Sequence, residues 1–494
     1  MIPARGFGGG SRRWAAVALL LPTLAVAQDR DESSMFGGDE SAADAGMMEL
    51  GGPEQSGSVL DGGPTARDAE QLTGPAGQSQ FDTGGQAADP LQIGGTLYLR
   101  YEADFKRDQP FEQTGFAAPG LLDLYLDARP SDRVRAFALG RLRYDPSLGP
   151  RGAPPFIPGV GVQTGSNPSV ELDQLWLRFD VLQKVYFTIG RQKVKWGVGR
   201  LWNPSDFLNV QRRDPLAPFD LRLGINAVKV HYPIESLGWN FYGFGLLDNN
   251  GPANTFGKLG GALRAEILIG PAEVSFSGVW GSERRPRYAI DVSTPIGPLD
   301  VYAEVSFRDG RDFTRYREND PSRDPPPASS IDFPIERLSG TLVPTTVGVS
   351  YSANYTDSAT VVVGAEYFYN PAGANKPIFH VPAVLAGTFV PFYAGIHYVG
   401  VFVLAPGLPS APWITMSLNN LINISDPSGV VRADAFFRVM SFLQIEVFAS
   451  VSYGLGEFRF GGTYELPTGP DGALEMRTIP LPVASTGVGL RVSL

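Results

Sequence analysis

Charged side chains recur at every second position in several stretches of this sequence. In LYLRYEADF, residues 97–105, Arg100, Glu102 and Asp104 are separated by single apolar residues. Residues two apart lie on the same face of a β-strand, so these three would share one face and the apolar residues the other. A face that carries both arginines and carboxylates can bind and orient polar or charged solutes. It lacks the paired nucleophile and base that covalent catalysis needs.

The residue types that most often carry catalysis or bind metals are scarce. The chain has no cysteine and three histidines, His231, His380 and His397, which lie far apart and form no metal-ligand spacing. A hydrolase would need a histidine beside an acid and a serine, and neither His380 nor His397 stands in an Asp-His or His-x-Ser context. The sequence also lacks a dinucleotide fingerprint and any nucleic-acid-binding module. We therefore predict no enzymatic activity, cofactor, metal or nucleic-acid partner.

The elements that would position the charged residues are short and alternating. From residue 91 onward, runs of about ten residues alternate between apolar and polar side chains and end at Gly, Pro, Asp, Asn or Ser. The connections between runs are alternately short and long, which is typical of outer-membrane barrels. The runs are 93–105, 121–129, 134–144, 170–180, 184–194, 224–233, 238–247, 259–269, 272–280, 287–293, 299–308, 345–355, 359–369, 395–405, 413–423, 429–439, 443–454 and 484–494.

The fold class that follows is all-β: a transmembrane antiparallel β-barrel of about 18 strands, with short periplasmic turns and long extracellular loops. An even number lets the first and last strands pair antiparallel and leaves no open edge in lipid. The runs 287–293, 395–405 and 413–423 are the weakest, so sixteen strands remain an alternative.

The charged face of each strand is expected to line the barrel interior, because a charge on the lipid-facing side costs about 2–4 kcal/mol near the membrane midplane. A barrel of this size encloses water. The predicted pore-lining residues are Arg100, Glu102, Asp104, Asp123, Asp127, Arg135, Arg141, Arg143, Lys229, Arg264, Glu266, Glu304, Arg308, Glu366, Arg432, Asp434, Arg438 and Glu446. For any single one of them, pairing with a neighbouring strand explains the charge as well as a role in solute passage does.

The stretch GRQKVKWGVGRLWNPSDFLNV, residues 190–210, follows one of these strands and is rich in aromatic and basic residues. Continuing the strand phase would direct Arg191 into lipid, so we predict a β-bulge at Gly190 that turns it inward. Trp196 is expected at the membrane interface, and a helix is expected to begin near Asn203. The segment 198–223 either folds into the barrel mouth and narrows it or packs on the rim. The residues assigned to a constriction are Arg191, Trp196, Arg200, Trp202, Asn203 and Asp206.

The same stretch carries a family resemblance. Gly190-Arg191-Gln192, Trp196-Gly197 and Asn203-Pro204-x-Asp206 resemble a pattern in porin-like bacterial outer-membrane families, including alginate-export-type barrels and related uncharacterised ones. The match covers a small part of the chain. It implies the barrel fold and a porin-like role, and it implies no particular substrate.

The N-terminal part differs in composition from the rest. Residues 1–27 have the charged, apolar and small-residue regions of a secretory signal peptide. Residues 28–90 contain 13 acidic residues and two arginines, a net charge of −11. With few large apolar residues, this segment is predicted to be a disordered periplasmic spacer or a binding site for a periplasmic partner. The barrel is assigned to 91–494.

Two functions are compatible with these features. The first is a channel in the bacterial outer membrane, in contact with its lipid, through which small polar or charged solutes diffuse. The alternative is the outer-membrane barrel of an envelope-spanning machine for polysaccharide export or surface motility, with 28–90 as its docking segment. The final strand, TGVGLRVSL, resembles the C-terminal signal read by the barrel-assembly machinery, although that signal most often ends in Phe.

Overall fold

The computed structural model describes residues 90–107, 109–149, 166–209, 211–217, 219–247, 255–281, 284–320, 322, 332–356, 359–386, 388–459, 461–468, 473–479 and 481–494. The predicted signal peptide, and residues 28–89 of the predicted acidic segment, lie outside the described residues. In the described part, no helix is long and apolar enough to cross a membrane.

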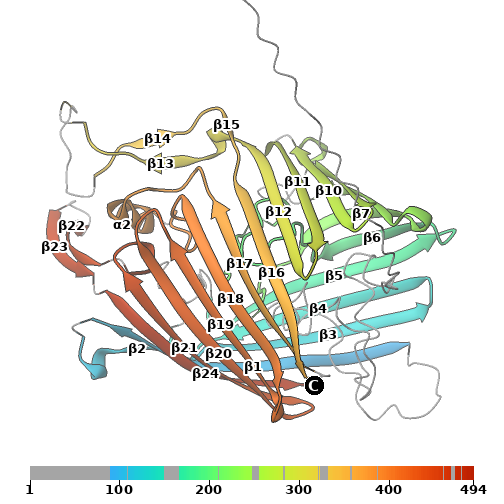
Figure 1. Cartoon of the computed structure of the whole chain (residues 1–494), viewed down its shortest axis with the longest axis horizontal. Helices are drawn as coiled ribbons and strands as arrows, with labels where there is room; N and C mark the ends of the chain where they lie inside the picture. Colours follow the sequence, from blue (N-terminus) through green and yellow to red (C-terminus); the bar gives the residue numbers. More distant parts are fainter. Residues whose placement is uncertain are drawn as a thin grey trace, which may run out of the picture.

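The described chain forms a closed antiparallel β-barrel of eighteen strands (Figure 1). The barrel strands are β1 (Leu91–Lys106), β3 (Gly120–Ser131), β4 (Val134–Tyr144), β5 (Ser169–Val181), β6 (Val185–Gln192), β7 (Ile225–Ile234), β8 (Trp239–Leu246), β9 (Gly260–Ile269), β10 (Ala272–Gly281), β11 (Arg284–Ile296), β12 (Leu299–Asp309), β16 (Thr345–Thr356), β17 (Ala359–Tyr369), β18 (His397–Leu408), β19 (Ala411–Asn423), β20 (Ser428–Met440), β21 (Leu443–Gly454) and β24 (Pro482–Ser493). Each pairs with the next in this order. The ring closes where β24 pairs with β1, with Arg491 opposite Tyr98.

The sequence prediction of eighteen strands is confirmed, and the alternative of sixteen is wrong. The three weakest runs all form full strands, as β11, β18 and β19. Their alternation is weak because prolines and glycines lie inside or beside them. The strands form nevertheless, because each pairs with its neighbours over many residues.

Several short elements at the ends of the barrel strands were not predicted. These are β2 (Gly115–Ala117), β13 (Thr314–Tyr316), β14 (Ile335–Arg337), β15 (Thr341–Leu342), β22 (Gly462–Thr468), β23 (Ala473–Ile479), the helix α2 (His380–Leu385) and the 3-10 turns η2 (Phe111–Gln113), η3 (Glu235–Leu237), η4 (Phe256–Lys258), η5 (Gly310–Asp312), η6 (Pro377–Phe379) and η7 (Glu457–Arg459). The hairpins β13–β14 and β22–β23 and the helix α2 lie at the same end of the barrel (Figure 1).

Alternation along the strands sorts side chains between the two faces of the wall. On β3, Leu124 is 53% exposed and Leu126 is 48% exposed on the outer face. The residues beside them, Asp123 and Asp127, are at most 1% exposed and face inward. Because successive side chains point to opposite faces of a strand, one pattern gives the barrel an apolar exterior and a charged interior.

The predicted β-bulge at Gly190 is wrong. β5 and β6 stay in register from Val181 opposite Val185 to Leu175 opposite Arg191, so Arg191 keeps the outward phase. Its Nε atom donates to the Gly224 carbonyl oxygen at 3.0 Å and its Nη1 atom to the Leu172 oxygen at 2.9 Å. These backbone acceptors let the arginine stay on the outer face.

The irregularity lies instead one strand away, between β4 and β5. Leu139 pairs with Gln174, whereas the following Gly140 pairs with Leu172, so Asp173 is the extra residue. Asp173 and Gln174 are consecutive and both buried, at 0% and 7% exposure. The bulge thus places an additional carboxylate inside the barrel.

Gly190 is nevertheless required by close packing of β6 on β5. Its φ angle is +123°, and a Cβ atom there would lie 2.2 Å from the Leu175 carbonyl oxygen. We expect Gly190→Ala to lower the free energy of unfolding by about 1–3 kcal/mol from backbone strain alone, measured by denaturant unfolding in detergent.

Gly245→Ala is the matched control, because a Cβ atom at Gly245 meets nothing within 4 Å. Equal unfolding midpoints for the two variants would contradict the packing argument.

Candidate functional site

Most predicted pore-lining residues form ion pairs along the inner wall. Arg141 pairs with Asp123 at 2.7 Å, Arg264 with Asp291 at 2.9 Å, and Arg432 with Asp434 at 2.6 Å. Further wall pairs join Arg100 to Glu102, Arg135 to Asp127, Arg143 to Glu171, Arg264 to Glu266 and Arg432 to Glu446. In these pairs the two signs largely neutralise each other, some within one strand, as in Arg100–Glu102, and others between neighbouring strands, as in Arg141–Asp123.

The remaining predicted positions lie at other depths of the wall. Asp104 and Lys229 are half-buried on the inward phase of β1 and β7. Arg438 follows the inward phase of β20 but is exposed near the turn to β21. Glu304, Arg308 and Glu366 form hydrogen bonds with a loop inside the barrel.

That loop connects β6 to β7, and we call residues 193–224 the crossing loop. Glu304 on β12 accepts hydrogen bonds from the backbone N–H groups of Gly199, at 2.7 Å, and Ser205, at 3.1 Å. The Ser205 hydroxyl and the Asn203 side-chain amide donate to the same carboxylate. One buried charge is therefore solvated by a single turn of the loop.

Glu366 on β17 is solvated in the same way by residues 200–202 of the loop. Its carboxylate accepts from the backbone N–H groups of Arg200, at 2.8 Å, and Trp202, at 2.7 Å, with Leu201 at 3.2 Å between them. The Tyr302 hydroxyl donates to it from β12 at 3.0 Å. Because both glutamates are at most 1% exposed, the loop amides replace the water that the two charges have lost.

The second half of the crossing loop contacts a different part of the wall. Phe219 packs edge-on against Tyr98 of β1, with ring centroids 4.8 Å apart, and lies under the Arg491 guanidinium of β24. Arg141 and Arg143 of β4 donate to the Leu221 carbonyl oxygen at 3.3 and 3.2 Å. The loop therefore leaves the wall at β6, contacts β12 and β17, and returns past β1, β4 and β24, so it crosses the lumen.

Apolar side chains hold the crossing loop against the wall between these polar anchors. Trp202 is fully buried against Phe368 and Tyr398, and its Nε1 atom donates to the Phe392 carbonyl oxygen at 3.0 Å. Trp196 is 3% exposed and packs against Phe244. The expectation that Trp196 lies at the membrane interface is wrong, because its side chain is buried inside the barrel against Phe244 of β8.

The expected helix after Asn203 is also absent from the described residues 203–209. The Asp206 side chain accepts from Asn209 at 2.8 Å and from Arg222 at 2.8 Å rather than capping a helix. Tertiary partners for these polar groups outweigh the local helix signal.

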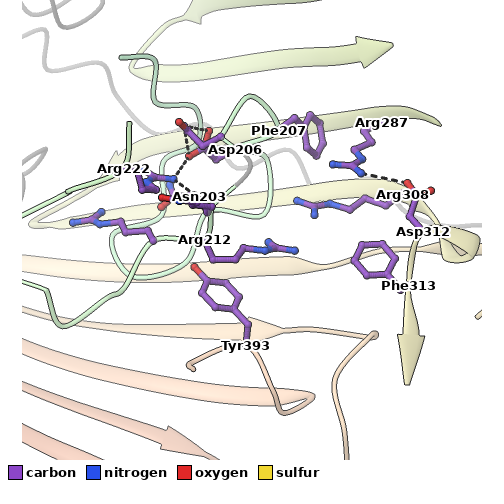
Figure 2. A pocket seen from close by; sticks show the side chains of 13 residues that line it. Asn203, Asp206, Phe207, Arg212, Arg222, Arg287, Arg308, Asp312, Phe313 and Tyr393 are labelled. Carbon is purple, nitrogen blue, oxygen red and sulfur yellow. Dashed lines mark hydrogen bonds and ion pairs between the residues drawn. The ribbon is translucent and has the colours of Figure 1, made fainter. Parts of the chain in front are cut away.

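A cavity of about 210 Å³ lies between the crossing loop and the wall of β11 and β12. Figure 2 shows that guanidinium groups dominate its lining, with Tyr393 and Phe313 beside them. The lining residues are Asn203, Asp206, Phe207, Asn209, Gln211, Arg212, Arg213, Arg222, Arg287, Arg308, Asp312, Phe313 and Tyr393. We call it the arginine cavity.

The sequence prediction included three of these residues, Asn203, Asp206 and Arg308. Arg287 was missed because it is the first residue of the predicted run 287–293, where no face of the strand could be assigned to it. Arg212 and Tyr393 were missed because both lie in long connections. The paired arginines of QRRD, 211–214, and ERRPR, 283–287, were a usable signal, since the first pair lies within a long connection and the second where a long connection meets a strand.

A second buried polar cluster lies beyond the cavity, where α2 and η7 pack on the ends of β19 and β20. The His380 Nε2 atom lies 2.8 Å from Asp426 Oδ2, which also accepts from the Glu457 backbone N–H at 2.8 Å. The Glu457 carboxylate accepts from Tyr398, from Asn423 and from the Phe392 backbone N–H. Since Phe392 also bonds Trp202, this cluster is linked to the crossing loop by one residue.

Neither site resembles a metal centre. Among the residues that the structure describes, no group of three or more His, Asp or Glu side chains is arranged to hold a metal ion.

No family model matches the chain, and no curated protein matches it. Solved structures similar to it include OccAB1 of Acinetobacter baumannii, which is 8% identical with a TM-score of 0.49 and covers 84% of this chain and 99% of that chain. OccK9 (OpdG) of Pseudomonas aeruginosa is 10% identical with a TM-score of 0.48, covering 82% and 98%. A triple mutant of Rhodopseudomonas blastica porin is 10% identical with a TM-score of 0.37, covering 82% and 100%. At these identities the likeness concerns the fold alone.

We expect Glu366→Gln to release the first half of the crossing loop. An amide in place of the carboxylate removes the charge and turns a donor toward backbone N–H groups, and each hydrogen bond to a charged group contributes about 1.5–3 kcal/mol. Limited trypsin digestion followed by mass spectrometry should show faster cleavage after Arg200, Arg212 or Arg213. Asp127→Asn, which removes a wall carboxylate bonded to Arg135, is the control for a general loss of stability. Equal cleavage rates in the native and Glu366→Gln proteins would contradict the anchoring role.

The Glu457 cluster predicts a pH dependence of stability. Burial raises the pKa of Glu457 to about 7, against the lowering effects of the Tyr398 hydrogen bond and His380. The folded protein then holds a proton that the unfolded chain has lost, so stability falls as pH rises from about 4.5 to about 7. Denaturant midpoints at pH 5 and pH 8 should differ more for the native protein than for Glu457→Gln. Glu318→Gln, at an exposed carboxylate, is the control, and an unchanged pH dependence in Glu457→Gln would rule out Glu457 as its source.

Proposed function

We propose that the protein is a channel of the bacterial outer membrane through which small polar or charged solutes diffuse, and that the crossing loop narrows it. The exterior supports the membrane location, because the outward residues of the wall are large and apolar along most strands. Examples are Leu172 and Leu175 on β5, Ile189 on β6 and Leu263 on β9, all more than a third exposed. In lipid such residues are favourable, and in water they would form an extensive apolar surface.

The interior supports passage of hydrated solutes. Inward side chains of the wall include Arg100, Asp127, Arg264 and Glu446, which are charged and paired. A wall of balanced charge keeps water in the lumen without a strong overall preference for one sign.

The observation that carries the proposal is that the crossing loop is attached at both ends of its course through the lumen. Glu304 and Glu366 hold residues 199–205 on one part of the wall, whereas Tyr98 and Arg141 hold residues 219–221 on another. A loop fixed at both positions limits the passage, because solutes must pass beside it. The arginine cavity lies on that course.

Single-channel conductance in planar bilayers tests this function. Deleting residues 199–222 should increase the conductance several-fold, since the lumen of an eighteen-strand barrel is then limited by its wall. If the deletion variant does not fold, the double variant Glu304→Gln/Glu366→Gln replaces it, because it keeps the full chain. This variant should produce larger or noisier currents than the native protein.

Glu336→Gln, on the exposed hairpin β13–β14, is the matched control for loss of an acidic residue. If the deletion variant and the double variant fold and conduct like the native protein, the crossing loop does not narrow the channel. A folded native protein that forms no channel would remove the channel function itself.

A further inference from the structure

The arginine cavity has an excess of positive charge that the rest of the described wall lacks. Five guanidinium groups line it, from Arg212, Arg213, Arg222, Arg287 and Arg308, against the two carboxylates of Asp206 and Asp312. Elsewhere on the wall, Arg100, Arg141 and Arg432 stand within ion-pair distance of carboxylates on the same or the next strand.

Two of the arginines are used by the crossing loop itself. Arg222 donates to Asp206 at 2.8 Å and forms a two-pronged pair with Asp220, so two carboxylates surround one guanidinium. Arg213 donates to the Arg200 carbonyl oxygen at 3.1 Å and bridges two parts of the loop. Both side chains have a structural role in the loop.

Of the other three arginines, only Arg287 forms an ion pair with a carboxylate of the described residues. Arg287 on β11 lies 3.3 Å from Asp312, which also pairs with Arg285 at 3.5 Å. Arg308 on β12 donates to the Pro204 carbonyl oxygen, which carries no charge. Within the described part of the chain, Arg212 forms no ion pair or hydrogen bond and lies over the Tyr393 ring. The five guanidinium groups of the cavity, set against the carboxylates of Asp206, Asp220 and Asp312, leave a surplus of two positive charges.

The polar atoms of this group are also incompletely bonded. Arg308 is 4% exposed, and its Nε atom has no hydrogen-bond partner among the described residues. The Nε atom of Arg287 is likewise buried without a partner in the described chain. A buried donor without an acceptor is costly, and like charges close together add to that cost. An arrangement of this kind is relieved when an anion enters.

Aromatic rings hold two of the three guanidinium groups in place. Arg308 lies over Phe207 and Arg212 over Tyr393, each with the guanidinium carbon 5.1 Å from the ring centroid. A ring covers one face of a planar guanidinium and leaves its N–H edges free to meet two oxygens of one anionic group. Figure 2 shows Arg212 and Arg308 extending into the same space from the loop and from the wall.

We infer that the arginine cavity is a transit site for small dianions, with Arg212, Arg287 and Arg308 as the residues that bind the two negative charges. The shared chemistry is a compact solute with two carboxylates or one phosphate group. A volume of about 210 Å³ suits such a solute and is below the usual size of a site for larger organic ligands. This inference rests on the proposed channel function. A dianion site in the arginine cavity would make the constriction selective for anions, whereas the wall of balanced charge is not.

Burial lowers the pKa of the Arg212 guanidinium, and the neighbouring Arg287 lowers it further. A bound dianion acts in the opposite direction, because it stabilises the charged form of the arginine. The cavity and the solute therefore stabilise each other's charge. The crossing loop supplies Arg212, whereas the wall supplies Arg287 and Arg308, so the site exists only while the loop is anchored.

Bilayer recordings on the full chain test the inference. Reversal potentials in a potassium chloride gradient give the anion-to-cation permeability ratio, and added succinate or inorganic phosphate should block the chloride current. Acetate, with one charge, should block at least roughly tenfold more weakly than succinate, because it meets fewer charge-assisted hydrogen bonds.

The variants Arg212→Gln and Arg308→Gln should each raise the half-blocking concentration of succinate by roughly tenfold or more and lower the permeability ratio. Arg212→Gln is the decisive variant, since Arg212 is in the loop and has no structural hydrogen bond among the described residues. Arg311→Gln is the matched control. It removes an arginine from η5 that is paired with Asp309 and does not line the cavity.

The outcomes separate the inference from the proposed function. The dianion site is overturned, and the channel function kept, by either of two results in channels that conduct. One is equal block by succinate of the native and Arg212→Gln proteins, and the other is equal block by succinate and by acetate. If the native protein forms no channel, calorimetric titration of the detergent-solubilised full chain with succinate and with phosphate still decides. Binding that Arg212→Gln weakens supports the site, and no binding overturns it. Block by phosphate without block by succinate, or the reverse, identifies which of the two dianion classes the site takes.

Discussion

Hydrogen bonds between β1 and β24 close the wall of this protein, and every other feature depends on that closure. A ring of paired strands has no open edge, so it can stand in lipid without leaving backbone groups unbonded. Once closed, the ring has two faces with different surroundings. Alternate residues of each strand must then suit lipid and water in turn, which is why Leu124 and Asp123 can be neighbours.

The interior of the ring sets a second requirement, because charges placed there must be balanced or hydrated. Most are balanced within the wall, by pairs such as Arg141 with Asp123. Glu304 and Glu366 are instead balanced by backbone N–H groups of the crossing loop. These N–H groups replace the water that the two carboxylates have lost, and the hydrogen bonds fix the first half of the crossing loop against the wall.

The crossing loop links parts of the protein that are distant in sequence. Trp202 contacts Phe392, and Phe392 contacts Glu457, so the crossing loop, the segment after α2 and the segment after β21 form one connected network. Tyr393, the residue after Phe392, lines the arginine cavity. A change in the conformation of the segment after α2 or the segment after β21 would therefore alter the cavity through direct contacts.

The sequence by itself determined the strands, their number and the phase of most side chains. Each of these follows from a period of two, which needs only neighbouring residues and the cost of placing a charge in lipid. Charged residues such as Arg141, Arg264 and Glu446 could be placed on the inner face from the period of two and the cost of a charge in lipid alone.

Only the tertiary structure decided the course of residues 193–224 and what the inward charges do. The Gly190 bulge, the interfacial Trp196 and the helix after Asn203 were wrong because local rules could not include partners such as Leu172, Phe244 and Arg222. Arg212 and Arg287 meet only when the ring has closed and the loop has crossed it. Contacts between segments so far apart have no period, and they arise from three-dimensional packing that a sequence pattern does not encode.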